Sequence, residues 1–232
     1  MGINGSIIVN NIFNVISSSS KTGNCYIYNK DLMIDIGVSF SKIKPYIKDI
    51  KLLCLTHEHS DHLRKKTIQK LMYEKPTIKI VCGEWLVQTL VDLGINKKNI
   101  FVLKLNKKYD LGEYIIELVP AIHDVENCGY KITIKNDNYK IFHITDTASV
   151  EHLEAKNYDM FAIESNYNEE LMQEHIQECL DNGDSENKLF YLQRAMNNHL
   201  SSKKTYDFLI ENMKNDSKYI LLHKSNYNYK EE

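Results

Sequence analysis

The sequence lacks any apolar run that approaches the roughly 18 residues needed to cross a bilayer. Its first residues carry no basic cluster followed by a long apolar stretch. We therefore expect no membrane span and no secretory signal peptide. The five cysteines are odd in number and widely spaced, and no two of them form a CxxC pair. This pattern excludes a disulfide framework and predicts reduced thiols in a cytoplasmic protein.

Arginine is scarce, because Arg64 and Arg194 are the only two in 232 residues. The 29 basic residues against 31 acidic ones give a formal net charge of −2. This balance excludes a protein that binds nucleic acid through bulk positive charge, and it leaves a local basic patch open. Proline is limited to three residues, and there is no repeat or low-complexity linker. We therefore expect one domain over residues 1–232.

Short apolar, β-branched runs alternate with helical patterns along the chain. The predicted strands cover residues 7–16, 25–28, 32–36, 51–55, 78–82, 100–103, 114–119, 130–134, 140–144, 160–163 and 219–222, with a turn over 17–24. The predicted helices cover a short segment through residue 47 that Ser39 or Ser41 caps, then 63–73, 84–93, 169–180 and 201–213. Strands that helices interrupt in this way favour layered sheets flanked by helices.

Three histidines and an aspartate lie within six residues, directly after the strand predicted at residues 51–55. They are His57, His59, Asp61 and His62. Imidazole and carboxylate groups suit zinc, manganese or iron better than calcium. On an extended segment His57 and His59 point the same way, and Asp61 and His62 follow where the chain turns into a helix. One short loop can therefore offer two ligands to each of two metal ions.

Four further positions lie at the ends of predicted elements. His123, Asp146 and His223 follow predicted strands, and His199 precedes a predicted helix. Each position alone is a weak signal, but together and in this order they form a specific pattern. The other histidines fit it less well: we expect His143 in the core or beside a ligand, and His152 and His175 on the surface.

His57, His59, Asp61 and His62 form an HxHxDH signature, and with the later His123, Asp146 and His223 the sequence resembles the metallo-β-lactamase superfamily. The upstream segments at residues 23–25 and 32–37 are similar to the superfamily's opening strands and its Asp-x-Gly turn. The resemblance covers nearly the whole chain. It implies an α/β (α+β) fold, the four-layer αβ/βα metallo-β-lactamase sandwich, with metals at one edge between the two sheets.

Within the superfamily the chain most resembles the small WalJ/YycJ-type exonuclease branch. Asp146 stands where classical β-lactamases carry cysteine, and residues 198–201 and 221–225 are similar to the ribonuclease Z and exonuclease arrangement. Residues 123–127, 145–147 and 164–166 match segments of the branch. The chain departs from it at Tyr167-Asn168, where the branch usually has His-Asp, and at residues 173–189, which are longer and more polar than expected there.

The resemblance also implies a cofactor and a set of roles. Two divalent ions are expected, zinc or manganese, with iron also open. His57, His59 and His123 would bind one ion, Asp61, His62 and His223 the other, and Asp146 would bridge them. Asp61 and His199 are the candidate catalytic residues, and His199 would contact the phosphate or protonate the leaving oxygen. Asp35 and Glu58 are candidates to orient imidazole N–H groups, and we interpret Thr56 and Thr145 as strand-end hydroxyls.

The leading hypothesis is a dinuclear-metal-dependent phosphodiesterase that acts on nucleic acid, as a 5′-to-3′ exonuclease on single-stranded DNA, with RNA open. Local positive charge for a polyanion would come from lysines near the ligands, namely Lys65, Lys66, Lys203, Lys204 and Lys224. Three alternatives remain. They are a hydrolase of a small molecule such as a lactone, thioester or cyclic nucleotide, a ribonuclease Z-like endoribonuclease, and a non-catalytic metal-binding module. The oligomeric state is left open.

Overall fold

The computed structural model describes residues 7–9 and 12–225. The chain divides into two compact units, residues 1–105 and residues 106–232. Each unit is built on one β-sheet, and the expectation of one domain over residues 1–232 stays a prediction. Among the described residues, no helix combines the length and the apolar character that crossing a membrane requires.

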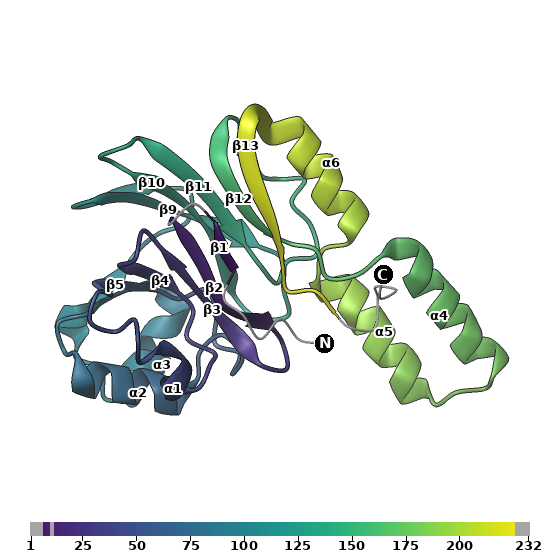
Figure 1. The fold of residues 1–232 in the computed structure, drawn as a ribbon. Helices are drawn as coiled ribbons and strands as arrows, with labels where there is room; N and C mark the ends of the chain where they lie inside the picture. The colour runs from purple at the N-terminus through teal and green to yellow at the C-terminus, as the bar shows by residue number, and fades with distance from the viewer. Residues whose placement is uncertain (1–6, 10–11, 226–232) are drawn as a thin grey trace. The chain divides into compact units, whose positions relative to one another are not determined.

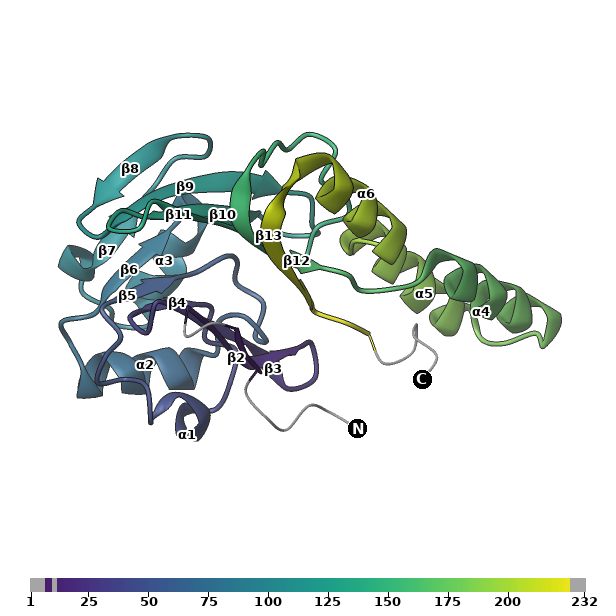
Figure 2. The same cartoon turned by 45° about the horizontal axis from the view of Figure 1, so that its top comes forward.

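A seven-stranded sheet forms the first unit, in the order β1-β2-β3-β4-β5-β6-β7 (Figures 1 and 2). Its strands are β1 Ile7–Val9, β2 Phe13–Ser19, β3 Gly23–Tyr28, β4 Leu32–Ile34, β5 Leu52–Cys54, β6 Lys79–Cys82 and β7 Ile100–Val102. Pairing is antiparallel from β1 to β4 and parallel from β4 to β7. The carboxyl ends of the parallel strands therefore share one edge, where sites gather in such sheets.

Helices cover one face of this sheet. They are α1 Phe40–Ile43, α2 Lys65–Glu74 and α3 Val87–Asp92, with the short 3₁₀ turns η1 Glu84–Leu86 and η2 Lys97–Asn99. Ile43 of α1, Ile68 of α2 and Leu90 of α3 join the strand side chains in one buried cluster. At about 1.5–3 kcal/mol for each fully buried aliphatic side chain, this cluster holds the helices against the sheet and fixes where the loops between them begin.

Two expectations for the first unit need correction. The strand predicted over residues 7–16 is two antiparallel strands, β1 and β2, with Ile7 opposite Val15, and residues 10–11 lie outside the described residues. The turn predicted over 17–24 is shorter, because β2 continues to Ser19 and pairs with Gly23. Cross-strand pairing keeps the serines of β2 in the sheet despite their preference for turns. The hairpin predicted from residues 25–28 and 32–36 is confirmed as β3 and β4.

In the second unit the sheet has six strands, in the order β13-β12-β11-β10-β9-β8 (Figure 2). Its strands are β8 Lys108–Leu111, β9 Tyr114–Ala121, β10 Asn127–Ile134, β11 Tyr139–Ile144, β12 Tyr158–Glu164 and β13 Met213–Leu222. The pairs from β8 to β11 are antiparallel, and β11, β12 and β13 are parallel. Between β12 and β13 the chain forms α4 Glu169–Asp181, α5 Glu186–Asn198 and α6 Ser202–Asn212. The aromatic rings of Phe142, Phe161 and Phe208 pack α6 onto the sheet.

Three features of the second unit differ from the sequence-based expectation. The edge strand β8 was not predicted, because it is short and polar, and it pairs with β9 across a turn that places Gly112 at φ +82°. The strand β13 begins at Met213, six residues earlier than expected. The helix α5 was also missed. It pairs with α4 in a hairpin whose own small core contains Met172, Cys179 and Leu192, and Figures 1 and 2 both show the two helices side by side.

All five cysteines are buried, and none is in a disulfide. Cys54 lies in the buried strand β5, as the sequence predicted for a small core residue. Burial raises the pKa of the Cys82 thiol to about 12, so this side chain stays a neutral thiol. Reduced thiols in the protein stay a prediction.

Candidate metal centre

The first group of candidate ligands occupies the loop between β5 and α2. This loop leaves the carboxyl end of β5 and turns tightly, with the backbone N–H groups of His62 and Leu63 both donating to the carbonyl of His59. The ring centroids of His57 and His59 lie 4.8 Å apart, and those of His57 and His62 lie 4.2 Å apart. The local turn therefore gathers the three imidazoles that the sequence placed together.

Asp35 holds one of these imidazoles. It follows β4 in the left-handed region, at φ 58°, and its Oδ2 lies 2.6 Å from Nδ1 of His62. A carboxylate accepts at that position, so the Nδ1 proton points to Asp35 and the Nε2 lone pair is the one presented to a metal. Complete burial raises the pKa of the Asp35 carboxyl, and hydrogen bonds from His62 and Thr56 counter that rise only in part. The expectation that Asp35 orients an imidazole agrees with this contact.

Thr56 and Asn24 extend the same network, although the sequence predicted no role for either. The Thr56 hydroxyl donates to Asp35 and lies 3.0 Å from Nδ1 of His57, so it is more than a strand-end hydroxyl. Asn24 Nδ2 lies 2.8 Å from His62 Nε2 and 3.3 Å from Asp61 Oδ2. The amide of Asn24 therefore faces two candidate ligand atoms at the end of the loop.

Close packing of Gly37 on the loop fixes its position. A Cβ atom at residue 37 would lie 1.6 Å from the Asp61 carbonyl oxygen and 2.8 Å from the His62 nitrogen. Both contacts are with backbone atoms, which cannot move away by a change of rotamer as a side chain can. The Asp-x-Gly turn thus supplies the carboxylate of Asp35 and, two residues later, the space that the ligand loop occupies.

The second group of candidate ligands lies at strand ends of the second unit. Asp146 follows β11 and His223 follows β13, and both have left-handed backbones, at φ 56° and φ 53°. Such conformations cost of order 1–3 kcal/mol for a non-glycine residue and are concentrated at functional sites. Asp146 Oδ1 lies 3.6 Å from His223 Nε2 and 3.5 Å from His199 Nδ1. Parallel pairing of β11, β12 and β13 brings these ends together.

Glu164 organises this second group. It is the last residue of β12 and is fully buried. Its Oε1 lies 2.8 Å from His199 Nδ1 and 3.0 Å from His223 Nδ1, and its Oε2 accepts from the backbone N–H groups of Thr147 and Leu200. One carboxylate therefore orients two imidazoles and anchors two loops.

The charge balance around Glu164 favours an ion pair. Burial raises the pKa of its carboxyl, but the imidazoles of His199 and His223 more than offset burial, and the net pKa lies below the usual range. Burial lowers the pKa of His199, yet the Glu164 carboxylate reverses this and holds the net pKa above its usual value. The sequence contains Glu164 at the end of an apolar strand, level with Asp146 and His223. That placement was the signal that could have identified it.

His123 and Asn166 complete the second group. His123 Nδ1 lies 3.1 Å from the carbonyl oxygen of Asn198, the last residue of α5. The ring centroids of His123 and His199 are 5.7 Å apart. Burial lowers the pKa of His123 in spite of the Asp146 and Asp124 carboxylates, which favours the neutral ring that metals bind. Asn166 donates to the His223 carbonyl at 2.8 Å and so supports the left-handed turn there.

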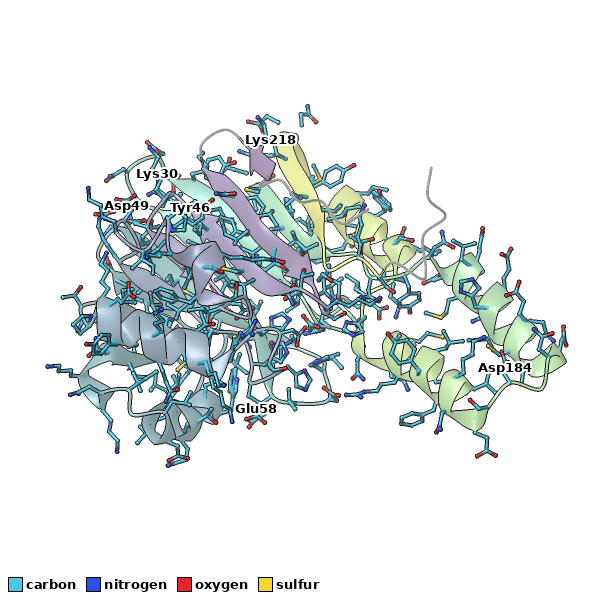
Figure 3. The ribbon with its side chains drawn as sticks, turned by 60° about the horizontal axis from the view of Figure 1, so that its bottom comes forward. Lys30, Tyr46, Asp49, Glu58, Asp184 and Lys218 are labelled. Atoms are coloured by element: carbon cyan, nitrogen blue, oxygen red, sulfur yellow. The ribbon has the colours of Figure 1, made fainter. Side chains whose placement is uncertain are left out.

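The remaining sequence-based expectations have mixed outcomes. Glu58 is exposed at the surface (Figure 3), and among residues 7–9 and 12–225 no imidazole contact with its carboxylate supports an orienting role. His143 is fully buried in β11, as expected for a core histidine. His152 is exposed in a turn, as predicted for a surface residue, whereas His175 on α4 is half-buried.

The chemistry of both groups fits divalent transition metals. The first unit offers His57, His59, Asp61 and His62. In the second unit, Asp146, Glu164, His199 and His223 each offer one atom, and these four atoms lie within 4.8 Å of one another. Imidazole nitrogens and carboxylate oxygens are the donors that zinc, manganese and iron prefer, and several of the imidazoles have a carboxylate or carbonyl at the opposite nitrogen.

Comparison with known proteins identifies a matching family and a related protein. The family model described as "Beta-lactamase superfamily domain" matches residues 34–204. An exodeoxyribonuclease named YycJ, from Bacillus anthracis, is 26% identical over 174 residues, which cover 69% of this chain and 64% of that protein. The matched part of the chain thus spans less than two thirds of this relative's length.

Two solved structures share the fold. The metallo-beta-lactamase fold protein YhfI from Bacillus subtilis superposes with a TM-score of 0.69 at 15% identity, over 91% of this chain and 85% of that one. The short form of human tRNase Z gives a TM-score of 0.66 at 11% identity, over 92% of both chains. At these identities the likeness establishes the fold alone, and it confirms the predicted metallo-β-lactamase fold class.

Proposed function

Because the chain belongs to the β-lactamase superfamily, we propose that it is a metal-dependent phosphodiesterase that degrades single-stranded DNA from the 5′ end. The observation that carries this proposal is the Glu164 carboxylate, which lies 2.8 Å from His199 and 3.0 Å from His223. One of these imidazoles is suited to bind a metal and the other to donate a proton. Phosphodiester cleavage needs both groups at one phosphate.

Two divalent ions, zinc or manganese, are proposed as the resident cofactor. By resemblance to the family, we propose as its ligands His57, His59, Asp61 and His62 of the first unit and His123, Asp146 and His223 of the second. When bound, such ions lower the pKa of water and polarise phosphoryl oxygens. Asp35 would keep the His62 proton on Nδ1, and Glu164 would do the same for His223, so that both rings present Nε2 to an ion.

His199 is proposed as the proton donor to the leaving oxygen. The Glu164 carboxylate holds the pKa of His199 above its usual value, although burial alone would lower it. This shift favours the imidazolium form, which is the form a general acid needs. His199 lies between the end of α5 and the start of α6, and the contact with Glu164 keeps its ring in place.

Two names among the relatives support nucleic acid as the substrate, because one is an exodeoxyribonuclease and another structure is a tRNase Z. Digestion of 5′-labelled and 3′-labelled single strands of DNA and of RNA by metal-loaded protein tests the proposal. We expect mononucleotides to leave from the 5′ end of DNA, chelation to stop the reaction, and Asp61→Ala and His199→Ala to reduce it strongly. His152→Gln, a change to an exposed histidine, is the matched control and should keep full activity.

Two results of the digestion would contradict the proposed function. If protein with verified bound metal releases nothing from DNA or RNA of any form, the proposal is wrong. Internal cleavage of RNA would instead favour the ribonuclease Z-like alternative. Hydrolysis of a small molecule is the second candidate, and the net charge of −2 with only two arginines favours it. A panel of a lactone, a thioester and a cyclic nucleotide tests that alternative. A cytoplasmic location stays a prediction.

A further inference from the structure

Positive charge is concentrated in the first unit. Residues 1–105 contain 15 Lys and Arg against 8 Asp and Glu, whereas residues 106–232 contain 14 against 23. Two of those eight acids, Asp35 and Asp61, already face the ligand imidazole of His62. A polyanion is therefore attracted to the surface of the first unit more than the net charge of the whole chain indicates.

The start of α2 lacks the capping hydrogen bond and the acidic residues that usually stabilise a helix N-terminus. Arg64 occupies the N-cap without a side-chain hydrogen bond, and the first turn contains no acidic residue. Lys65 and Lys66 follow, and both are exposed. Cations are unfavourable at the positive end of a helix dipole. Such a conflict, directly after the ligand His62, is typical of a surface selected for function over stability.

One face of α2 combines cations with an exposed aromatic ring. Lys66, Lys70 and Tyr73 are spaced by four and three residues, which places them on the same side of the helix; we call them the α2 stripe. Tyr73 is 87% exposed, the largest exposure among the exposed large hydrophobic residues. Lys70 Nζ lies 4.5 Å from the ring centroid of Phe40 in the neighbouring α1. In the described part of the chain, neither Lys66 nor Lys70 forms an ion pair with a carboxylate.

We propose that the α2 stripe is a docking surface for single-stranded DNA. The ammonium groups of Lys66 and Lys70 would neutralise phosphates, and the ring of Tyr73 would stack on an unpaired base. Since α2 begins three residues after His62 and its ten residues span about 15 Å, a strand along the stripe leads to the ligand loop. The proposal rests on the proposed function, because it names the surface that holds the substrate of that site.

The α4–α5 hairpin is a contrasting surface. Residues 169–198 carry seven acidic side chains and two basic ones, and Asp184 lies in the turn between the two helices (Figure 3). A polyanion is repelled there. The charge of the second unit therefore favours the first unit as the place where the strand binds.

Fluorescence anisotropy of a labelled oligothymidine strand, measured in EDTA to prevent cleavage, tests the α2 stripe. Lys66→Gln and Lys70→Gln should each weaken binding and reduce the salt slope, d log K/d log[salt], by about 0.7. Tyr73→Ala should weaken binding about 5- to 150-fold, and Tyr73→Phe should restore it, because stacking needs the ring and not the hydroxyl. These side chains are exposed, so the variants should fold as the wild type does.

Lys30→Asn is the matched control. Lys30 lies in the turn before β4 (Figure 3), with a left-handed backbone that asparagine also adopts, and the change removes one positive charge from the same unit. The proposal is wrong if Lys30→Asn weakens binding as much as Lys70→Gln, since bulk charge would then explain the affinity. It is also wrong if Tyr73→Ala binds like the wild type, or if the losses are larger for an oligouridine strand, which would assign the surface to RNA.

Hydrolysis of a small diester, bis(p-nitrophenyl) phosphate, separates this proposal from the proposed function. The α2 stripe variants should keep kcat on the small diester and raise KM for DNA. An unchanged KM for DNA together with normal hydrolysis overturns the docking surface and leaves the proposed function standing. If neither substrate is hydrolysed but DNA binding still depends on Tyr73, the docking surface stands and the proposed function is wrong.

Discussion

Replacement of Glu164 by glutamine tests the part of the site that the structure describes most fully. The wild-type carboxylate accepts four N–H groups, two at each oxygen: the imidazoles of His199 and His223 at Oε1, and the backbones of Thr147 and Leu200 at Oε2. Glutamine has nearly the same shape but only one acceptor oxygen. Its NH₂ group must therefore face either two backbone donors or two imidazoles.

The expected magnitude follows from these contacts. Hydrogen bonds to a charged group contribute about 1.5–3 kcal/mol each, and removing one partner of a buried ion pair costs about 3–5 kcal/mol. We expect Glu164→Gln to lower the free energy of unfolding of the metal-free protein by about 3–5 kcal/mol. If the amide NH₂ faces the imidazoles, both rings must move their proton to Nε2. The Nε2 lone pair of His223 is then lost to a metal, and affinity should fall about 10- to 100-fold.

Urea unfolding in EDTA measures the first effect, and calorimetric titration with zinc or manganese measures the second. Glu169→Gln is the matched control. Its Oε1 accepts from the Ser201 hydroxyl, and a glutamine oxygen can still accept there, so the change should cost less than about 1 kcal/mol. The reasoning would be refuted if Glu164→Gln were as mild as this control in both measurements. If Glu164→Gln lowers stability but leaves metal affinity unchanged, the hydrogen-bond network of Glu164 is supported and His223 is not a metal ligand.

Three further experiments test the packing and burial of other residues. Gly37→Ala should displace the backbone of Asp61 and abolish high-affinity metal binding, whereas Gly112→Asn, in open space, should leave calorimetric titrations unchanged. The free energy of unfolding should fall as the pH rises from about 10 to about 12, because burial raises the pKa of Tyr158 from 10.0 to about 12 and the unfolded chain ionises first; urea titrations of Tyr158→Phe should show a weaker fall. Burial also raises the pKa of Cys82 to about 12, so Ellman's reagent at pH 8 should label the native thiols slowly and all five rapidly in denaturant; fast labelling of the native protein would contradict this burial.

The sequence predicted most of the strands and helices, because their hydrophobic periodicity is local information. The hairpin of β3 and β4 and the helix α2 are examples. The strand β8 and the helix α5 were missed for different reasons. The strand β8 is a polar edge strand that pairing with β9 holds in place. The helix α5 is amphipathic, with Leu189, Leu192 and Met196 facing α4. Its first turn is polar, so the helical spacing of the apolar residues was not recognised in the sequence.

The sequence by itself identified the candidate ligand types and their order, because HxHxDH places three imidazoles and a carboxylate in one tight turn. It also identified Asp35 as a neighbour of a ligand. Only the tertiary structure decided that Glu164 serves two histidines, and that Asn24 and Thr56 join the network of His62. The two Glu164 contacts join residues 35 and 59 positions apart in the chain. The Asn24–His62 contact joins residues 38 positions apart, and the Thr56–Asp35 contact joins residues 21 positions apart. Strand pairing brings such distant residues together, parallel at β12 and β13 and antiparallel at β3 and β4, and no local pattern records that pairing.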